Sequence, residues 1–386
     1  MKKYMVRFAL SAMICVGWFP LDMRGQTLPV EPDTETAGVH YMFVPAFAYT
    51  SDLGFVGGGL GQRIDYGDGV SPFLDLTQLT FTASTKGLIS SRIRYDRTRS
   101  LNRSIRSTFD LRVERFFNQN YFGVGNHTGF RRSLWDEEHY FYEHREVKLD
   151  YTARTPLEEW FGDERLDLLF TYGLIYNSPK VAGEDSFYAA DRPFGRKGGW
   201  IHEFGTGLVF ENRENEFDPR NGSRYEFRVS AAPSGVSDYG FGRIGLNTRH
   251  YIPLFHNVIL AHQFDVRMTS GDLPFWALPK MGSEDELRGY AENRFRGQSR
   301  WFSLTEVRAW VLEFPDYDLK FGLHFFWDAG RVYSERDSIE DSLSNLKHTF
   351  GVGGSTALFS PDLIFRGEVG FSDEMYRIYI GIGYLF

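Results

Sequence analysis

Cysteine, long apolar runs and excess positive charge are all scarce in this sequence. Its 386 residues include one cysteine, Cys15, so the rest of the chain offers neither a disulfide framework nor a thiol nucleophile. No internal apolar run is long enough to form a membrane-spanning helix. The formal net charge of -8 argues against nucleic acid as a partner, because nucleic-acid binding requires a concentrated basic face.

Catalytic and metal-binding motifs are also missing. The sequence contains no Gly-x-Ser-x-Gly elbow, no phosphate-binding Gly-Lys-Ser/Thr loop and no His-Glu-x-x-His helix. The ten histidines are dispersed, and pairs such as His139 and His144 lack the spacing of metal ligands on a strand. We therefore predict no enzyme activity, no cofactor and no metal site. A barrel lipase or palmitoyl transferase stays open as an alternative, because such enzymes use dispersed Ser, His and Asn or Asp residues.

Aromatic residues and glycine, by contrast, are abundant. Aromatics make up 17% of the chain, led by 36 Phe and 21 Tyr, while the mean hydropathy is -0.35. This combination favours a transmembrane β-barrel, whose strands alternate between lipid and lumen and so are not hydrophobic on average. A soluble all-β protein with the same alternation is the competing interpretation.

The N-terminal segment has the layout of a secretory signal peptide. Basic residues precede the apolar run 8–21, and the chain turns polar over residues 22–26, so we predict cleavage near Gly25 or Gln26. A membrane anchor is the alternative, but the run is short and contains Pro20. We predict a signal peptide over residues 1–26, a short periplasmic leader over 27–38 and a transmembrane β-barrel over 39–386.

Alternating side chains mark the strands of this barrel. Tyr225, Phe227 and Val229 alternate with charged residues, which places aromatic and aliphatic groups on one face and charges on the other. The same pattern divides the chain into about sixteen antiparallel strands, an even number that suits closure of a bacterial barrel. The predicted strands lie near 39–51, 54–65, 73–85, 87–97, 103–117, 138–154, 165–177, 200–212, 223–232, 239–252, 257–270, 301–313, 319–332, 347–358, 362–372 and 376–386.

The connections between these strands alternate in length. Short turns rich in Gly, Pro, Asn or Asp alternate with a set that includes the long segments 118–137, 178–199, 271–300 and 333–346. Short periplasmic turns and longer external loops are typical of outer-membrane barrels. The final stretch, 376–386, alternates apolar residues through Tyr384 to the terminal Phe386, so we predict one continuous last strand with a single apolar face.

One external loop carries a distinctive motif, Leu287-Arg288-Gly289-Tyr290. It resembles the arginine-glycine-aromatic motif in the sixth external loop of the Omp85 superfamily, the barrels related to outer-membrane assembly factors and surface antigen D15. The resemblance extends to other stretches, in the family's order: residues 121–126, residues 217–222, residues 305–308, residues 326–331 with Phe326 and Gly330, and the terminal Phe386. The terminal aromatic resembles the signal by which assembly machinery recognises such barrels.

Arg288 needs a partner if the loop folds back into the lumen, because an isolated buried guanidinium is very costly. Strand alternation places Asp328 and Glu306 on lumenal faces, so Asp328 is the predicted first partner and Glu306 the second carboxylate. Gly289 would let the backbone pass close to the wall, and Tyr290 would pack beside it. The competing interpretation is an exposed loop arginine.

The resemblance implies a bacterial outer-membrane protein that acts in protein insertion or translocation. Its first and last strands would meet at a seam that opens toward lipid, where a substrate strand pairs. The expected partners are outer-membrane lipids and substrate or accessory envelope proteins. Too few residues precede the first strand for a polypeptide-transport-associated domain, so we expect a barrel-only member. A passive, partly plugged pore for ions or small solutes is the alternative.

Overall fold

A computed structural model describes residues 38–67, 73–100, 105–158, 165–215, 218–317, 319–334, 337, 344–358 and 364–386. The predicted signal peptide and all of the predicted leader except Gly38 lie outside this part of the chain. No helix within it is long and apolar enough to cross a membrane.

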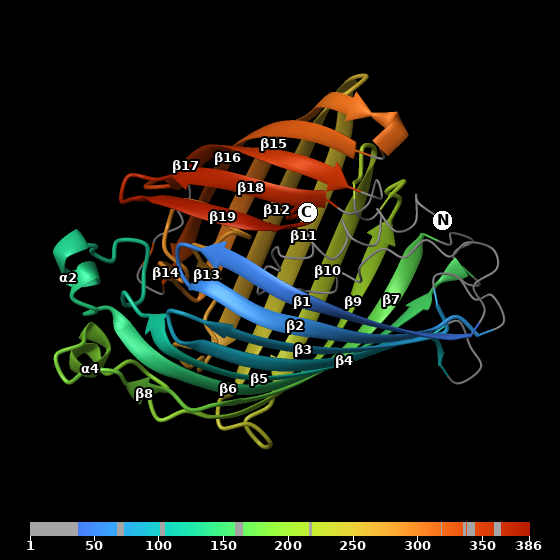
Figure 1. Cartoon of the computed structure of the whole chain (residues 1–386). Helices are drawn as coiled ribbons and strands as arrows, with labels where there is room; N and C mark the ends of the chain where they lie inside the picture. Colours follow the sequence, from blue (N-terminus) through green and yellow to red (C-terminus); the bar gives the residue numbers. More distant parts are fainter. Residues whose placement is uncertain are drawn as a thin grey trace.

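Sixteen long antiparallel strands form a closed barrel in the described residues (Figure 1). Sequential strands pair with one another around the wall, and β1 meets β19 to close it. The strands are β1 Val39–Thr50, β2 Gly54–Asp65, β3 Asp75–Ser84, β4 Leu88–Ser100, β5 Ile105–Asn120, β6 Phe141–Pro156, β7 Leu166–Asn177, β9 Gly199–Glu211, β10 Gly222–Ala232, β11 Phe241–Phe255, β12 Val258–Gly271, β15 Ser299–Phe314, β16 Leu319–Tyr333, β17 Lys347–Leu358, β18 Ile364–Phe371 and β19 Tyr376–Ile382. The predicted all-β barrel and its strand number are confirmed.

Short elements within the long connections gather at one end of the barrel (Figure 1). They are α2 Arg132–Asp136, β8 Lys180–Val181, α4 Phe187–Asp191, β13 Lys280–Met281 and β14 Phe295–Arg296. A 3-10 turn, η1 Pro315–Tyr317, follows β15 at the opposite end. Because long loops are external in such barrels, the end with α2 and α4 is the extracellular end.

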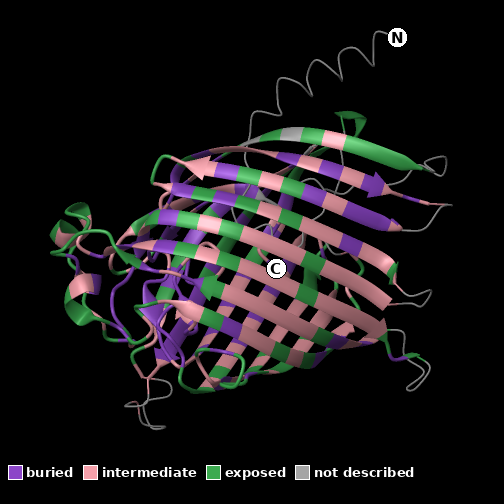
Figure 2. Ribbon diagram, turned by 90° about the horizontal axis from the view of Figure 1, so that it is seen from below, coloured by how far each residue is buried: buried purple, intermediate pink, exposed green. Residues whose placement is uncertain are grey.

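The strands present opposite faces to lipid and to the lumen, as the alternation predicts (Figure 2). On β10, Tyr225, Phe227 and Val229 are exposed on the outer surface. On the lumenal face, Arg224 forms an ion pair with Glu226 at the same strand. Large apolar side chains remain exposed because their solvent is lipid, and the charged side chains are paired inside the wall.

The last strand is shorter than the sequence predicts. β19 ends at Ile382, and Gly383 follows in the left-handed region with φ 76°. Beyond this turn, Tyr384 and Phe386 are buried at 7% and 4% exposure among lumenal side chains. The prediction of one continuous strand to Phe386 is therefore wrong, because a positive φ at glycine interrupts the pleat and redirects the tail inward.

The seam between the first and last strands is sparse. Every residue of β19 pairs with β18, whereas Thr50↔Tyr379 is the single register pair between β1 and β19 in the described residues. Two hydrogen bonds extend it, from Ser51 N to the Ile378 carbonyl (3.2 Å) and from Ile378 N to Ser51 Oγ (3.0 Å). The seam is held at its extracellular end, and within the part of the chain that the structure describes most of this β1 edge has no strand partner.

Candidate functional site

The connection between β12 and β15 folds into the barrel instead of standing out in solvent. Leu287, Tyr290 and Phe295 are at most 1% exposed, and they pack against wall residues Phe302 and Leu304. The short pair β13 and β14 gives the loop its own hairpin. Burial of these large apolar groups stabilises the inserted position, since each contributes roughly 1.5–3 kcal/mol when fully removed from water.

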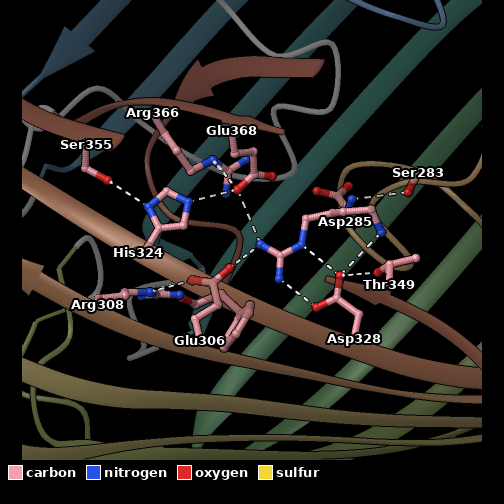
Figure 3. A network of polar contacts seen from close by, with 12 residues as sticks. Ser283, Asp285, Glu306, Arg308, His324, Asp328, Thr349, Ser355, Arg366 and Glu368 are labelled. Atoms are coloured by element: carbon pink, nitrogen blue, oxygen red, sulfur yellow. Dashed lines mark hydrogen bonds and ion pairs between the residues drawn. The ribbon is translucent and has the colours of Figure 1, made fainter. Parts of the chain in front are cut away.

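Arg288 lies at the centre of this inserted loop with no exposure to solvent. Its Nε and Nη2 donate to the two carboxylate oxygens of Asp328 at 2.9 and 2.7 Å, which is a bidentate pair. Its Nη1 forms ion pairs with Glu306 and, at 3.3 Å, with Glu368. Figure 3 shows the three carboxylates converging on one guanidinium from strands β15, β16 and β18. The guanidinium also lies 3.5 Å from the ring centroid of Phe326.

The sequence motif residues Leu287, Arg288, Asp328, Glu306 and Phe326 are thus brought together. Sequence reasoning did not select the third carboxylate, Glu368, although it lies on the lumenal side of β18 in register with Gly353 and Tyr379. Strand alternation around Arg366 and Glu368 carried that signal. A buried arginine next to three carboxylates is overcompensated, so further cations are needed nearby.

Those cations come from the wall. Arg308 Nε donates to Glu306 at 2.7 Å, and Arg366 lies 3.7 Å from Glu368. Three arginines therefore face three carboxylates in a buried cluster, shown in part in Figure 3. Mutual pairing at this level of burial is what makes the charges tolerable inside the barrel.

Ser355, His324 and Glu368 form a row that contains the residue types of a hydrolase triad. His324 Nε2 lies 3.1 Å from Glu368, and Ser355 Oγ lies 3.4 Å from His324 Nδ1. Glu368 is also paired with Arg288, and all three side chains are at most 3% exposed. A triad needs a carboxylate dedicated to the histidine and room for substrate at the hydroxyl, so this row serves the buried ion cluster.

Glycines allow the loop to approach the wall closely. Gly289 has φ 133°, and a Cβ placed on it would lie 2.7 Å from the backbone carbon of Phe371. A Cβ on Gly330 would lie 2.8 Å from the Trp301 carbonyl oxygen and 3.0 Å from the sulfur of Met281 in the loop. Neither position has space for a larger residue, which explains why the motifs contain glycine.

The loop is also fastened to the turn between β18 and β19. Tyr290 donates its hydroxyl to Asp373 at 2.5 Å, and Ser372 donates to the Gly289 carbonyl at 2.8 Å. Arg294 forms a bidentate pair with Glu374, with both distances 2.7 Å. The motif tyrosine therefore binds the turn that leads into β19, the last strand at the seam.

A second external loop covers the first. Gly125 N donates to the Arg296 carbonyl at 2.7 Å. The side-chain Nδ2 of Asn120 donates to the Glu292 carbonyl at 2.8 Å. Tyr121 and Phe275 pack edge to face at 5.2 Å in an aromatic cluster. This is the structural role of the 121–126 stretch. In the 217–222 stretch, Asp218 accepts from Trp310 Nε1 at 3.1 Å, and Phe217 lies outside the described residues.

Asp52 connects the inserted loop to the seam. This residue lies in the β1–β2 turn, and its carboxylate accepts a hydrogen bond from the backbone N–H of Glu292 at 3.0 Å. The same carboxylate forms an ion pair with Arg377 of β19. One side chain thus ties together the first strand, the last strand and the loop.

Glu292, next to this contact, provides a pH-dependent prediction. Burial raises the pKa of Glu292 from 4.5 to about 7; Asp52 and Glu114 add to the rise, while Gln119 and Lys280 oppose it. Between pH 4.5 and about pH 7, Glu292 keeps its proton in the folded protein but has lost it in the unfolded chain. The free energy of unfolding therefore falls as the pH rises through this range. We expect Glu292→Gln to remove this loss, which reaches about 3 kcal/mol above pH 7.

The measurement is the thermal unfolding midpoint of wild type and Glu292→Gln from pH 5 to 8.5. The two proteins should diverge as pH rises toward 7, with the variant more stable. Glu137→Gln, on an exposed residue of the external surface, is the matched control. A difference between wild type and Glu292→Gln that does not vary with pH would contradict the prediction.

The C-terminal residue lies in the same lumen. Arg308 Nη2 donates to the Phe386 backbone oxygen at 3.2 Å, and its guanidinium stacks 4.9 Å from the Phe386 ring and 4.0 Å from the Tyr384 ring. Arg308 therefore joins the tail to Glu306 of the ion cluster. The role of Phe386 as a recognition signal stays a prediction, and the structure adds a second role in packing.

Comparison with known proteins agrees with this architecture. Among solved structures, BamA from Haemophilus ducreyi lacking POTRA domains 1-3 aligns with a TM-score of 0.62 and 13% identity, covering 98% of this chain and 78% of that one. CdiB from Escherichia coli aligns with a TM-score of 0.59 and 11% identity, covering 96% and 67%. At these identities the likeness concerns the fold. No curated protein sequence matches the chain significantly.

A lipid-facing outer surface, a charged lumen and long loops at one mouth define an integral β-barrel of the bacterial outer membrane. The Omp85 superfamily domain matches residues 75–386, which covers most of the barrel. The chain belongs to the Omp85 superfamily, as its loop motif indicated.

Proposed function

We propose that this barrel takes part in inserting proteins into, or translocating them across, the outer membrane by opening the seam between β1 and β19. The observation that carries the proposal is the sparse seam, with one register pair on a first strand of 12 residues. An unpaired strand edge is a template for another strand. A substrate strand could therefore pair with β1 while remaining in contact with lipid.

The inserted loop is suited to hold this seam in place. Through Arg288 it binds strands β15, β16 and β18, and through Tyr290 it binds the turn that leads into β19. The backbone N–H of Glu292 then donates to Asp52 in the β1–β2 turn. These contacts reach both sides of the seam from within the lumen, so the loop acts as a latch in this proposal.

The passive pore is the second candidate, and the open space in the lumen favours it. A cavity of about 360 Å³ adjoins strands β4, β5, β6, β7, β9 and β10. Its lining is mainly charged and includes Arg92, Arg94, Asp96, Arg106, Arg154 and Arg228. Such a lining is compatible with ions and small polar solutes, although the loops at the external mouth obstruct their path.

Reconstitution of the purified chain into lipid vesicles separates the two functions. One assay measures, by protease protection, how fast a urea-denatured outer-membrane barrel protein inserts into the vesicles. The other assay measures the release of a small dye trapped inside the vesicles. We expect insertion to be faster than into empty vesicles, because the β1 edge supplies a template. Vesicles that contain an unrelated porin are the control for membrane disturbance. Dye release without faster insertion would support the pore instead.

A further inference from the structure

Two arginines face each other on the outer surface of the barrel. Arg115 of β5 and Arg145 of β6 are directly opposite in the antiparallel register. Both side chains are 44% exposed. Like charges at directly opposite positions destabilise a sheet, so this pair has a cost that the fold alone does not require.

A single carboxylate lies between them. Arg115 Nε and Arg145 Nε both donate to Oε1 of Glu143, at 2.5 and 2.8 Å. Lys180 of β8 is in register with Glu143 and is exposed. Two guanidinium groups therefore share one carboxylate, and Lys180 stands opposite that carboxylate in the strand register. These four residues together carry an excess of two positive charges. By contrast, Arg92 in the lumen donates to both carboxylate oxygens of Asp110.

The position of these charges along the strands is that of the lipid headgroups. Two residues closer to the membrane centre, about 7 Å along the strands, the next pair of lipid-facing residues is Val113↔Val147. Both of these side chains are exposed. On the extracellular side, the Arg115 guanidinium lies 4.0 Å from the Phe117 ring centroid. Aromatic residues of this kind mark the membrane interface in barrels.

We propose that Arg115, Arg145 and Lys180 bind the phosphate of a phosphorylated lipid headgroup in the outer leaflet. Two guanidinium groups side by side offer planar donors that match phosphate oxygens, and their remaining charge is unbalanced. The valines below them provide an apolar surface for the acyl chains of the same molecule. A lipid satisfies both features, whereas a soluble anion would satisfy only the first.

The proposal is tested with the purified full chain and a defined lipid. Native mass spectrometry measures retention of diphosphorylated lipid A and of its dephosphorylated form by wild type and by the double variant Arg115→Gln/Arg145→Gln. We expect the double variant to lose at least about tenfold in affinity for the phosphorylated lipid, since two charge-assisted contacts are removed. Wild type should retain the dephosphorylated lipid as weakly as the variant does.

A matched control removes the same charge elsewhere. Arg131→Gln/Arg132→Gln changes two exposed arginines at the start of α2 and should leave retention unchanged. Resistance of the folded barrel to sodium dodecyl sulfate shows that each variant is assembled. Equal retention by all proteins, or equal retention of both lipids by wild type, would overturn the proposal. Displacement of the lipid by millimolar inorganic phosphate would show a free-anion site and would also overturn it. None of these outcomes depends on the insertion activity.

Discussion

Replacing Arg288 with alanine is expected to cost about 3–5 kcal/mol of stability, the largest effect of any single change in the barrel. The substitution leaves Asp328, Glu306 and Glu368 buried without their shared cation. It also removes the contact with the Phe326 ring. The measurement is the temperature at which the folded form, resistant to sodium dodecyl sulfate, converts to the unfolded form on a gel, together with the yield of assembled barrel.

A double-mutant cycle with Asp328→Ala tests the pairing itself. Because each single change already breaks the bidentate contact, the double variant should lose much less than the sum of the two single losses. Arg288→Lys keeps the charge but not the planar fork, so an intermediate loss is expected. Arg228→Ala is the matched control, since that lumenal arginine is 49% exposed and pairs with Glu226. Additive losses in the cycle would refute the latch pairing.

Locking the seam with a disulfide is expected to abolish insertion of substrate proteins. Thr50 and Tyr379 are direct partners across the seam, and both side chains are buried on the lumenal face. Directly opposite residues of antiparallel strands have Cα separations compatible with a disulfide. The one cysteine in the sequence, Cys15, lies in the predicted signal peptide. The double variant Thr50→Cys/Tyr379→Cys therefore places its two thiols as the pair that can form a disulfide across the seam.

Insertion in vesicles is measured before and after reduction. The oxidised double variant should be inactive, and reductant should restore activity in the same sample. The control is Thr82→Cys/Ser90→Cys, which cross-links neighbours β3 and β4 within the continuous wall and should have no effect. Activity that persists in the oxidised seam variant, together with altered dye release in Arg288 variants, would favour the pore.

Much of the barrel could be predicted from sequence because lipid and lumen impose opposite demands on successive residues. The alternation of Phe227 with Glu226 and Arg228 follows from these two environments, with the aromatic side chain toward lipid and the charged ones toward the lumen. The strand β17, Lys347–Leu358, has the predicted bounds. The contact of Arg288 with Asp328 could be reached by the same reasoning, since a buried guanidinium requires a lumenal carboxylate. These features depend on local pattern and charge balance.

The features that sequence reasoning missed depend on distant contacts. The tail after Ile382 continues the apolar pattern, and only the packing of Tyr384 and Phe386 against Arg308 shows that Gly383 redirects it. Glu368 becomes the third carboxylate because barrel closure brings β18 beside the loop. The link from Asp52 to Arg377 spans 325 residues of sequence, and no local pattern predicts it.

Asp52 has a thermodynamic consequence for the whole molecule. This one carboxylate contacts both Glu292 of the loop and Arg377 of the last strand. Insertion of the loop and closure of the seam are therefore linked, and each changes the free energy of the other by the same amount. A molecule outside the cell that pulls the loop outward would weaken the seam. A strand that parts β1 from β19 on the membrane side would, by the same free energy, loosen the loop at the cell surface.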